Sequence, residues 1–150
     1  MLPLRKIISK QLGELLLERN IINKEELNKA LEIQKGKGGL IGEILNELGY
    51  AKEEDIAHAL TAQYGFPFLP LSNYEIEQEV AKSIPENVCS QYCLIPIDKI
   101  GNSLTLAMSN PLNAQAIEDI EEVSKCSVQV FVATPSDIRN AIEKYYKKNK

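Results

Sequence analysis

Two stretches of the chain repeat one another without a gap, and this repeat limits what the first half can fold into. Residues 11–34 read QLGELLLERNIINKEELNKALEIQ, and residues 40–63 read LIGEILNELGYAKEEDIAHALTAQ. Identical residues occupy equivalent positions in both copies, including a glycine near the start, the leucine pair Leu16/Leu45 and a glutamine at the end. Self-similarity at a fixed period predicts one supersecondary unit used twice.

Each copy predicts a helix–turn–helix. Leu12, Leu15 and Leu16 follow helical spacing in the first copy, and equivalent apolar residues do so in the second. Asn20 and Gly49 are equivalent, and both residue types tolerate the left-handed conformation that ends a helix. Asn23, followed three residues later by Glu26, predicts a capping box for the next helix. The expected inner faces of the second helices are Leu27, Ala30, Leu31 and Gln34, and Ile56, Ala59, Leu60 and Gln63.

The recurring glutamines and glycines are candidate functional positions. Gln34 and Gln63 continue an apolar stripe, so each amide needs a hydrogen-bond partner or the rim of an opening. One such glutamine alone favours a bond to nearby backbone, whereas recurrence in register favours a shared surface role. Gly13 and Gly42 each cost a first helical turn up to about 1 kcal/mol relative to alanine. Close helix packing or close approach of a ligand to backbone N–H groups would explain them.

The second half predicts a small α/β unit. Residues 64–75 are expected to connect the halves, and Gly101-Asn102 predicts a hairpin turn. Thr134 and Pro135 predict the start of the last helix. The expected helices cover 76–83, 85–91, a segment after Pro111 with Ile117, Ile120 and Val123 inward, and a last helix with Ile138, Ala141, Ile142 and Tyr145 inward; the expected strands cover 94–97, 104–108 and 127–132.

These elements together predict an α+β fold. Its N-terminal helical subdomain, residues 1–66, contains two tandem helix–turn–helix repeats. Its C-terminal subdomain, residues 67–150, is a mixed sheet with the order β-β-α-β-α. The division at residue 66 is an expectation from the end of the repeat.

Charge and composition exclude several classes of function. A net charge of −4 argues against binding DNA or RNA, which requires a positive surface. No segment approaches the roughly 20 apolar residues of a membrane span, and the N-terminus does not resemble a signal peptide. We therefore expect a cytoplasmic protein that meets a membrane only through partners. Cys89, Cys93 and Cys126 are expected to be free thiols, and no metal site is expected.

No catalytic residues are predicted. The segment Lys35–Gly39 lacks the spacing of a phosphate loop and is interpreted as a flexible spacer. His58 is the single histidine, and no nucleophile is placed to partner it. The paired acidic residues fit the first turns of helices better than a metal cluster. We expect a binding protein that requires no cofactor.

The repeat resembles the N-terminal domain of the ATPases of type II secretion and type IV pilus assembly. This family is GspE/PilB-like, and its ligand-binding version is the N-terminal domain of the MshE type. Its hallmark is a tandem motif beginning RLG, with a central glycine, spaced leucines and a final glutamine, in two copies separated by five residues. Residues 11–34 and 40–63 match that length, and Lys35–Gly39 match the spacer. The similarity extends from Ile84-Pro85-Glu86 to the last helix.

The resemblance implies a ligand, cyclic di-GMP, held between the two motif copies. In such a site leucines cover the guanines, a glycine admits close backbone approach, and arginine and glutamine contact bases and phosphates. It also implies two protein partners, the ATPase core of the secretion or pilus system and its inner-membrane platform protein. The residues implied as contacts are Gln11, Leu12, Gly13, Leu27, Leu31, Gln34, Leu40, Ile41, Gly42, Ile56, Leu60 and Gln63.

Departures from the motif leave a second function open. The opening arginine is Gln11 in the first copy and Leu40 in the second. Each lost arginine removes a charge-assisted contact worth about 1.5–3 kcal/mol to a dianionic ligand, although Lys10, Arg19 or Lys37 could replace them. The leading hypothesis is a non-catalytic regulatory and docking domain that binds cyclic di-GMP. The alternative is a degenerate module that docks on a platform protein and binds no nucleotide, and an enzyme is a third class.

Overall fold

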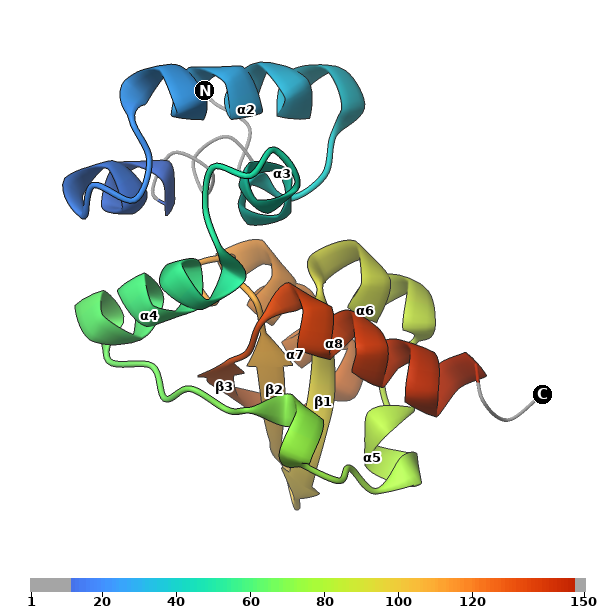
Figure 1. The fold of residues 1–150 in the computed structure, drawn as a ribbon. Coiled ribbons are helices and arrows are strands. Elements are labelled where there is room, and N and C mark those ends of the chain that lie inside the picture. Colours follow the sequence, from blue (N-terminus) through green and yellow to red (C-terminus); the bar gives the residue numbers. More distant parts are fainter. Residues whose placement is uncertain (1–11, 148–150) are drawn as a thin grey trace.

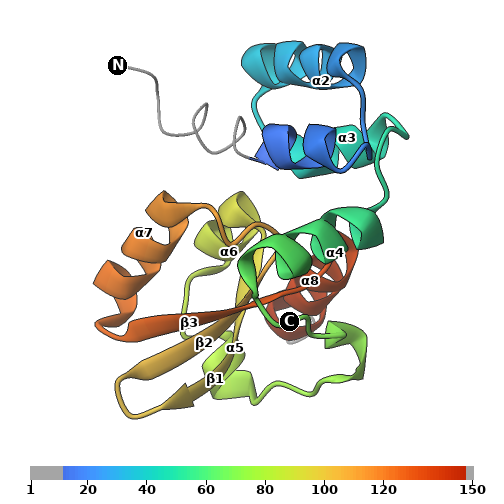
Figure 2. The same ribbon diagram turned by 90° about the vertical axis from the view of Figure 1, so that its left-hand side faces the viewer.

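The chain folds into a helical part and a three-stranded sheet covered by helices (Figure 1). The computed structural model describes residues 12–147. Residues 12–18 are helical and are followed by α2 (Lys24–Lys37), α3 (Ile41–Glu47) and α4 (Glu53–Tyr64). The helical residues 12–18, α2 and α3 lie together, and we call them the three-helix lobe. Helix α4 lies between this lobe and the α/β lobe, residues 67–147 (Figures 1 and 2).

Local signals explain where the first helices begin and end. The Asn23 side chain accepts a hydrogen bond from the Glu26 N–H at 2.8 Å, and the Glu26 carboxylate accepts one from the Asn23 N–H at 2.9 Å. The predicted capping box is therefore confirmed. Asn20 and Gly49 have φ values of 58° and 78°, so both adopt the predicted left-handed conformation.

The predicted flexible spacer at residues 35–39 is wrong for its first three residues. Helix α2 continues to Lys37, and only Gly38 and Gly39 leave it. Their φ values of 76° and 99° lie in the region that favours glycine, so the chain turns sharply there into α3. Lysines in the last turn of α2 face the negative end of the helix dipole, which favours the longer helix.

The sheet has the order β1-β2-β3. Strand β1 (Leu94–Ile100) pairs antiparallel with β2 (Ser103–Met108) through the predicted turn at Gly101. Strand β2 pairs parallel with β3 (Ser127–Val132), and α7 (Ala114–Ser124) connects them. The predicted mixed sheet and α+β class are confirmed.

Helices cover both faces of the sheet. Helix α7 lies on one face, and α8 (Pro135–Ile142) lies on the other (Figures 1 and 2). Thr134 caps α8 by accepting a hydrogen bond from the Asp137 N–H, as the sequence predicts. The prediction that Val123 points inward is wrong. Ala116 and Ile120 carry the buried face of α7, while Val123 in the last turn is 52% exposed. The remaining elements are η1 (Leu71–Asn73), α5 (Gln78–Ala81), α6 (Glu86–Tyr92) and the π-helical turn η2 (Glu143–Lys147).

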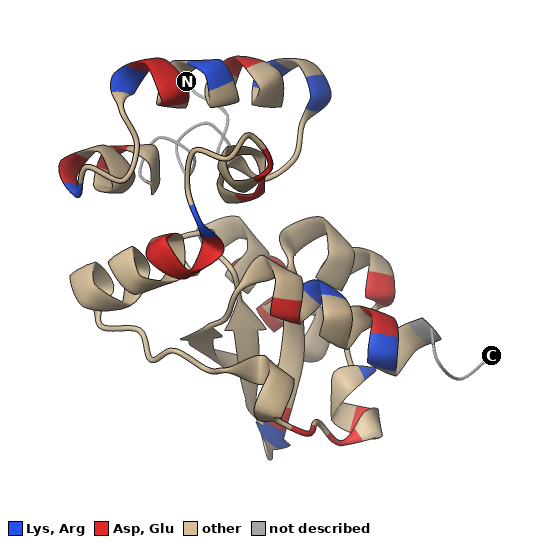
Figure 3. Cartoon of the chain, viewed as in Figure 1, with Lys and Arg blue, Asp and Glu red and all other residues tan. Residues whose placement is uncertain are grey.

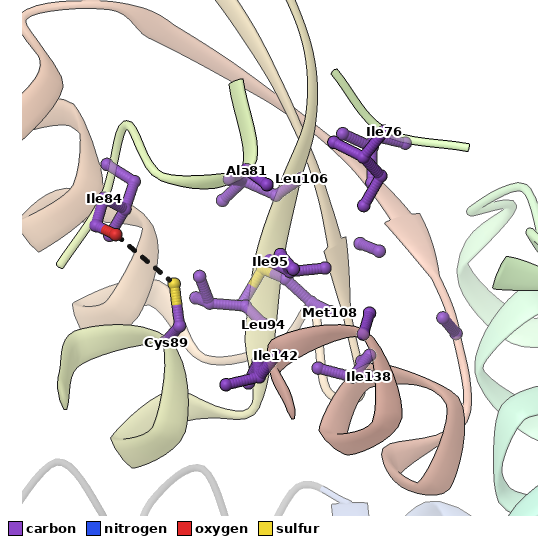
Figure 4. Packing of buried hydrophobic residues seen from close by; sticks show 14 of the residues in the cluster. Ile76, Ala81, Ile84, Cys89, Leu94, Ile95, Leu106, Met108, Ile138 and Ile142 are labelled. Atoms are coloured by element: carbon purple, nitrogen blue, oxygen red, sulfur yellow. Dashed lines mark hydrogen bonds between the residues drawn. The ribbon is translucent and has the colours of Figure 1, made fainter. Parts of the chain in front are cut away.

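Buried apolar side chains form two clusters. One fills the α/β lobe between the sheet, α6, α7 and α8 (Figure 4). The other joins the three-helix lobe to α4 and reaches the sheet at Val132. The two parts of the chain therefore have largely separate cores that meet near the ends of β2 and β3.

Within residues 12–147, none of the helices combines the length and the apolar character needed to cross a bilayer.

Candidate ligand-binding cleft

A cleft of about 230 Å³ lies between the three-helix lobe, α4 and the α/β lobe. Its apolar side comes from the repeat, and its polar side comes mainly from the α/β lobe. The residues that follow β2 and β3 contribute to it, because the carboxyl ends of these two parallel strands lie side by side. The lining residues are Leu12, Gln34, Leu40, Ile41, Gly42, Glu43, Glu53, Ile56, Ala57, Gln91, Tyr92, Ser109, Asn110, Asn113, Gln115, Ala133 and Pro135.

Half of the candidate motif residues line this cleft. The first copy contributes one residue from the start of the motif and one from its end. The second copy contributes the residues at the start of α3 and one residue of α4. These residues are Leu12 and Gln34 from the first copy, and Leu40, Ile41, Gly42 and Ile56 from the second. The fold therefore brings both copies of the repeat to one opening.

The other candidates lie elsewhere. Leu27 and Leu60 are buried in the helical cluster, and Leu31 packs against it half-buried. Gly13 is buried beneath Leu27. Gln63 is exposed and does not line the cleft, and Gln11 lies outside the described residues.

The two repeated glutamines are not equivalent, contrary to the expectation of a shared surface role. Gln34 is only 8% exposed, and its Nε2 donates to the carbonyl oxygen of Gly39 at 3.0 Å. The Gly38-Gly39 turn folds back to supply that acceptor. After Gln63, by contrast, α4 ends at the left-handed C-cap Gly65 and the chain continues toward the sheet, and the Gln63 side chain is exposed. The hydrogen bond from the Gln34 side chain to the nearby backbone of Gly39 therefore accounts for the burial of this amide, as expected for a single glutamine of this kind.

The two repeated glycines also have different surroundings. A Cβ atom at Gly13 would lie 2.8 Å from Leu27 Cδ1, so close packing of two helices explains this glycine. A Cβ atom at Gly42 would lie 3.7 Å from Leu12 Cδ2, an ordinary contact distance. Because Gly42 also lines the cleft, close approach of a ligand stays a prediction at that position alone.

Sequence reasoning missed the contribution of the α/β lobe. Ser109 and Asn110 directly follow β2, and Ala133 and Pro135 follow β3. Ligands in open α/β sheets bind beyond the carboxyl ends of strands. By its local pattern, the Ser109-Asn110-Pro111 segment predicts only the end of the second strand. The position of this segment after a strand of a mixed sheet is the signal that could have marked it as part of a ligand site.

Hydrogen bonds fix the polar wall of the cleft. The carboxylate of Asp119 accepts from the Tyr92 hydroxyl at 2.5 Å and from Gln115 Nε2 at 2.7 Å. The side-chain oxygens of Asn110 and Asn113 accept backbone N–H groups of residues 112 and 116. Four side chains that line the cleft are therefore held in place before any ligand arrives, which lowers the ordering cost of binding.

The charge of the described lining is negative. Glu43 and Glu53 are its charged members, and among residues 12–147 neither lysine nor arginine lines the cleft. Acidic positions lie along α3 and at the start of α4 (Figure 3). Arg19 and Lys37, considered as replacements for the missing arginines, are exposed and outside the lining, and Lys10 lies outside the described residues.

The described residues offer little for metal binding or thiol chemistry. Over residues 12–147, His, Cys, Asp and Glu do not gather into a group of three that could hold a metal ion. The three cysteines are free and buried. Burial raises the pKa of the Cys89 thiol to about 11 and that of the Cys93 thiol to about 12, so both stay protonated and unreactive at neutral pH. The arrangement is suited to binding a ligand between apolar and amide side chains.

Comparison with known sequences identifies relatives. The family model of the MshEN domain matches residues 64–150. The chain is 34% identical over 139 residues to the type IV pilus assembly ATPase PilB of Myxococcus xanthus, covering 93% of this chain and 25% of the relative. It is 30% identical over 139 residues to PilB of Thermus thermophilus, covering 91% and 16%. The chain thus spans a quarter or less of these relatives.

Solved structures share the fold. A structure of MshE with cyclic di-GMP aligns with a TM-score of 0.67 and 26% identity, covering 90% of this chain and 98% of that chain. The N-terminal domain of XpsE aligns with a TM-score of 0.73 and 21% identity, covering 93% and 96%. The chain therefore belongs to the MshEN domain family and is homologous to N-terminal regions of the type IV pilus assembly ATPase PilB.

Proposed function

We propose that this chain is a non-catalytic regulatory and docking domain of a type IV pilus assembly or type II secretion ATPase system, and that cyclic di-GMP binds in its cleft. The proposal places the domain in the cytoplasm, between the ATPase core and an inner-membrane platform protein. One observation carries it: residues from both motif copies, including Leu12, Gln34 and Ile41, converge on a single cleft. The similarity to MshE, which has a structure with cyclic di-GMP, supports the choice of ligand.

The chemistry of the lining suits part of this ligand. Leu12, Leu40 and Ile56 provide apolar surface for a planar base, and amide side chains on the opposite wall provide hydrogen-bonding groups. Gly42 leaves space for a ligand beside the backbone of α3. The phosphates would take their contacts from outside the described lining.

A second candidate function is docking on a platform protein without a nucleotide. The observation that favours it is the pair of carboxylates, Glu43 and Glu53, in a described lining that has no basic residue. Because Arg139 pairs with Glu43, the repulsion of a dianionic ligand would come mainly from Glu53. Leu40, which stands at an arginine position of the motif, packs half-buried against the apolar cluster of the α/β lobe.

Calorimetric titration with cyclic di-GMP separates the two functions. We expect the wild-type chain to release heat on binding, Gln34→Ala to weaken binding at least about tenfold because a cleft side chain is lost, and Gln63→Ala to bind like wild type. Gln63 is the matched control, since it has the same motif position but is exposed outside the cleft. Absence of heat at high ligand concentration would instead support docking alone.

A gain-of-function substitution tests the cost of the missing arginine. Leu40→Arg restores the residue that opens the family motif at a position on the cleft. One charge-assisted contact contributes about 1.5–3 kcal/mol, which predicts an increase in cyclic di-GMP affinity of roughly 10- to 150-fold. The same titration measures it, with Leu48→Arg as the control, because Leu48 caps the opposite end of α3, outside the cleft. Unchanged affinity in Leu40→Arg would argue against phosphate contact at this position.

A further inference from the structure

One arginine ties the three-helix lobe to the α/β lobe. Arg139 of α8 donates from Nη2 to Glu43 Oε1 at 2.7 Å and from Nε to Glu43 Oε2 at 3.2 Å. Its Nη1 also donates to the carbonyl oxygen of Ser90 in α6. A bidentate guanidinium–carboxylate pair fixes orientation as well as distance. This ion pair joins α3 to α8, and therefore joins one lobe to the other.

A second polar contact lies beside it. The Glu53 carboxylate, at the start of α4, accepts from the Ser136 N–H at 2.8 Å and from the Ser136 hydroxyl at 2.9 Å. This contact holds α4 to the first turn of α8, where the helix dipole favours a carboxylate. Glu53 thus fixes α4, whereas Arg139 reaches across to the three-helix lobe itself.

Glu43 belongs both to this ion pair and to the cleft. It lines the cleft together with Ile41 and Gly42 of the same helix, and it holds Arg139 on its other side. The side chains of Arg139 and Glu43 are 37% and 26% exposed, so the bond is open to competition from solvent and ligands. The cleft volume of about 230 Å³ is below the roughly 300–1,000 Å³ of most small-molecule sites.

Few apolar contacts join the three-helix lobe directly to the α/β lobe, and Leu40, which packs against the α/β cluster just before α3, is one of them. The buried side chains of the three-helix lobe belong to the helical cluster, which reaches the sheet mainly at Val132 and is separate from the core of the α/β lobe. The segment between α3 and α4 contains Gly49 in a left-handed conformation, with open space around it. A rotation of a few degrees there would separate α3 from α8 and would slide α3 over α4 within the helical cluster, to which both helices contribute.

We propose that the Arg139–Glu43 pair is a latch that holds the cleft closed, so that breaking this one bond moves the three-helix lobe away from the α/β lobe. Any ligand or partner that engages the Glu43 carboxylate competes with Arg139, and binding in the cleft is thereby coupled to the arrangement of the lobes. The latch is independent of the identity of the ligand and needs no nucleotide for its test.

Distance measurement between two spin labels tests the latch in the ligand-free chain. Labels on Lys29→Cys in α2 and Glu122→Cys in α7 report on the two lobes, since both positions are exposed. The three native thiols are buried, which keeps them unlabelled. We expect a narrow distance distribution in the otherwise wild-type chain and a shift to longer, broader distances in Arg139→Gln.

Partner substitutions make the result specific. Glu43→Gln is expected to give the same shift, and the double variant no further shift, because all three remove one bond. Arg19→Gln, which alters an exposed arginine in the turn directly after helical residues 12–18, is expected to leave the distribution unchanged. Circular dichroism verifies folding, and Glu43→Gln carries the test if Arg139→Gln does not fold. A wild-type distribution in either folded variant would overturn the latch.

Discussion

Replacing Leu45 with alanine is expected to lower the free energy of unfolding by about 2–5 kcal/mol. Leu45 is fully buried in α3, within the cluster that joins the three-helix lobe to α4. Removing its side-chain carbons loses their burial and leaves a cavity that close neighbours refill only in part. Urea unfolding followed by circular dichroism at pH 7 measures the change.

Val123→Ala provides the matched control for this prediction. Val123 lies on α7 but is 52% exposed, so its truncation is expected to change the free energy of unfolding by no more than about 0.5 kcal/mol. The Val123→Ala measurement also distinguishes an exposed Val123 from the inward-facing Val123 that the sequence predicts, because truncation of an inward valine would lower the free energy of unfolding by more. A loss of less than about 1 kcal/mol in Leu45→Ala would contradict the packing of α3.

The second large effect is a loss of stability in alkaline solution. Burial raises the pKa of Cys89 to about 11 and that of Cys93 to about 12, from 9.0 for an exposed thiol. Above pH 9 the unfolded chain releases these protons while the folded chain keeps them. The unfolded state then binds fewer protons, so the free energy of unfolding falls as pH rises.

The expected slope is about 1.4 kcal/mol per pH unit for each thiol between pH 9 and 11. The contribution is complete below pH 9 and is lost as pH rises through the folded-state pKa values. Tyr146, whose pKa burial also raises, adds to the loss above its usual titration range. Urea unfolding at several pH values in the presence of a reductant measures the slope.

Cys89→Ala combined with Cys93→Ala is the control for the alkaline slope. The double variant loses some packing at every pH, but its slope between pH 9 and 11 should be smaller than that of the wild-type chain. Figure 4 shows Cys89 among the labelled side chains of the core, close to Ile84. Equal slopes in the two proteins would mean that both thiols are reached by solvent in the folded state.

Local sequence signals predicted most of the fold. Asn23 with Glu26, Gly49, Gly101 and Thr134 each specify a cap or turn within a few residues, and all of them act as predicted. The strand at residues 127–132 has the predicted bounds. The family resemblance was also correct, since the MshEN family model matches residues 64–150 and PilB of Myxococcus xanthus aligns with 93% of the chain. The division of the chain at residue 66 stays a prediction.

The cleft was only half predictable, because its other half depends on long-range contacts. Both glutamines of the repeat have the same local sequence role, yet only Gln34 meets a returning glycine turn and lines the cleft. Glu43 and Arg139 are 96 residues apart, and no periodic pattern connects them. Which copy of a repeated residue faces the α/β lobe is decided when the lobes pack, and this information is absent from the repeat.

The proline in β1 has a consequence for how this domain behaves at high concentration. Strand β1 is at the border of the sheet, and Pro96 removes an N–H group near its middle, where the pairing with β2 also shifts between Pro96 and Asp98. A border strand with an interrupted row of donors is a poor template for a strand from another molecule. Many copies of this domain can therefore be crowded together, as in a multisubunit assembly, with little risk that their sheets join through β1.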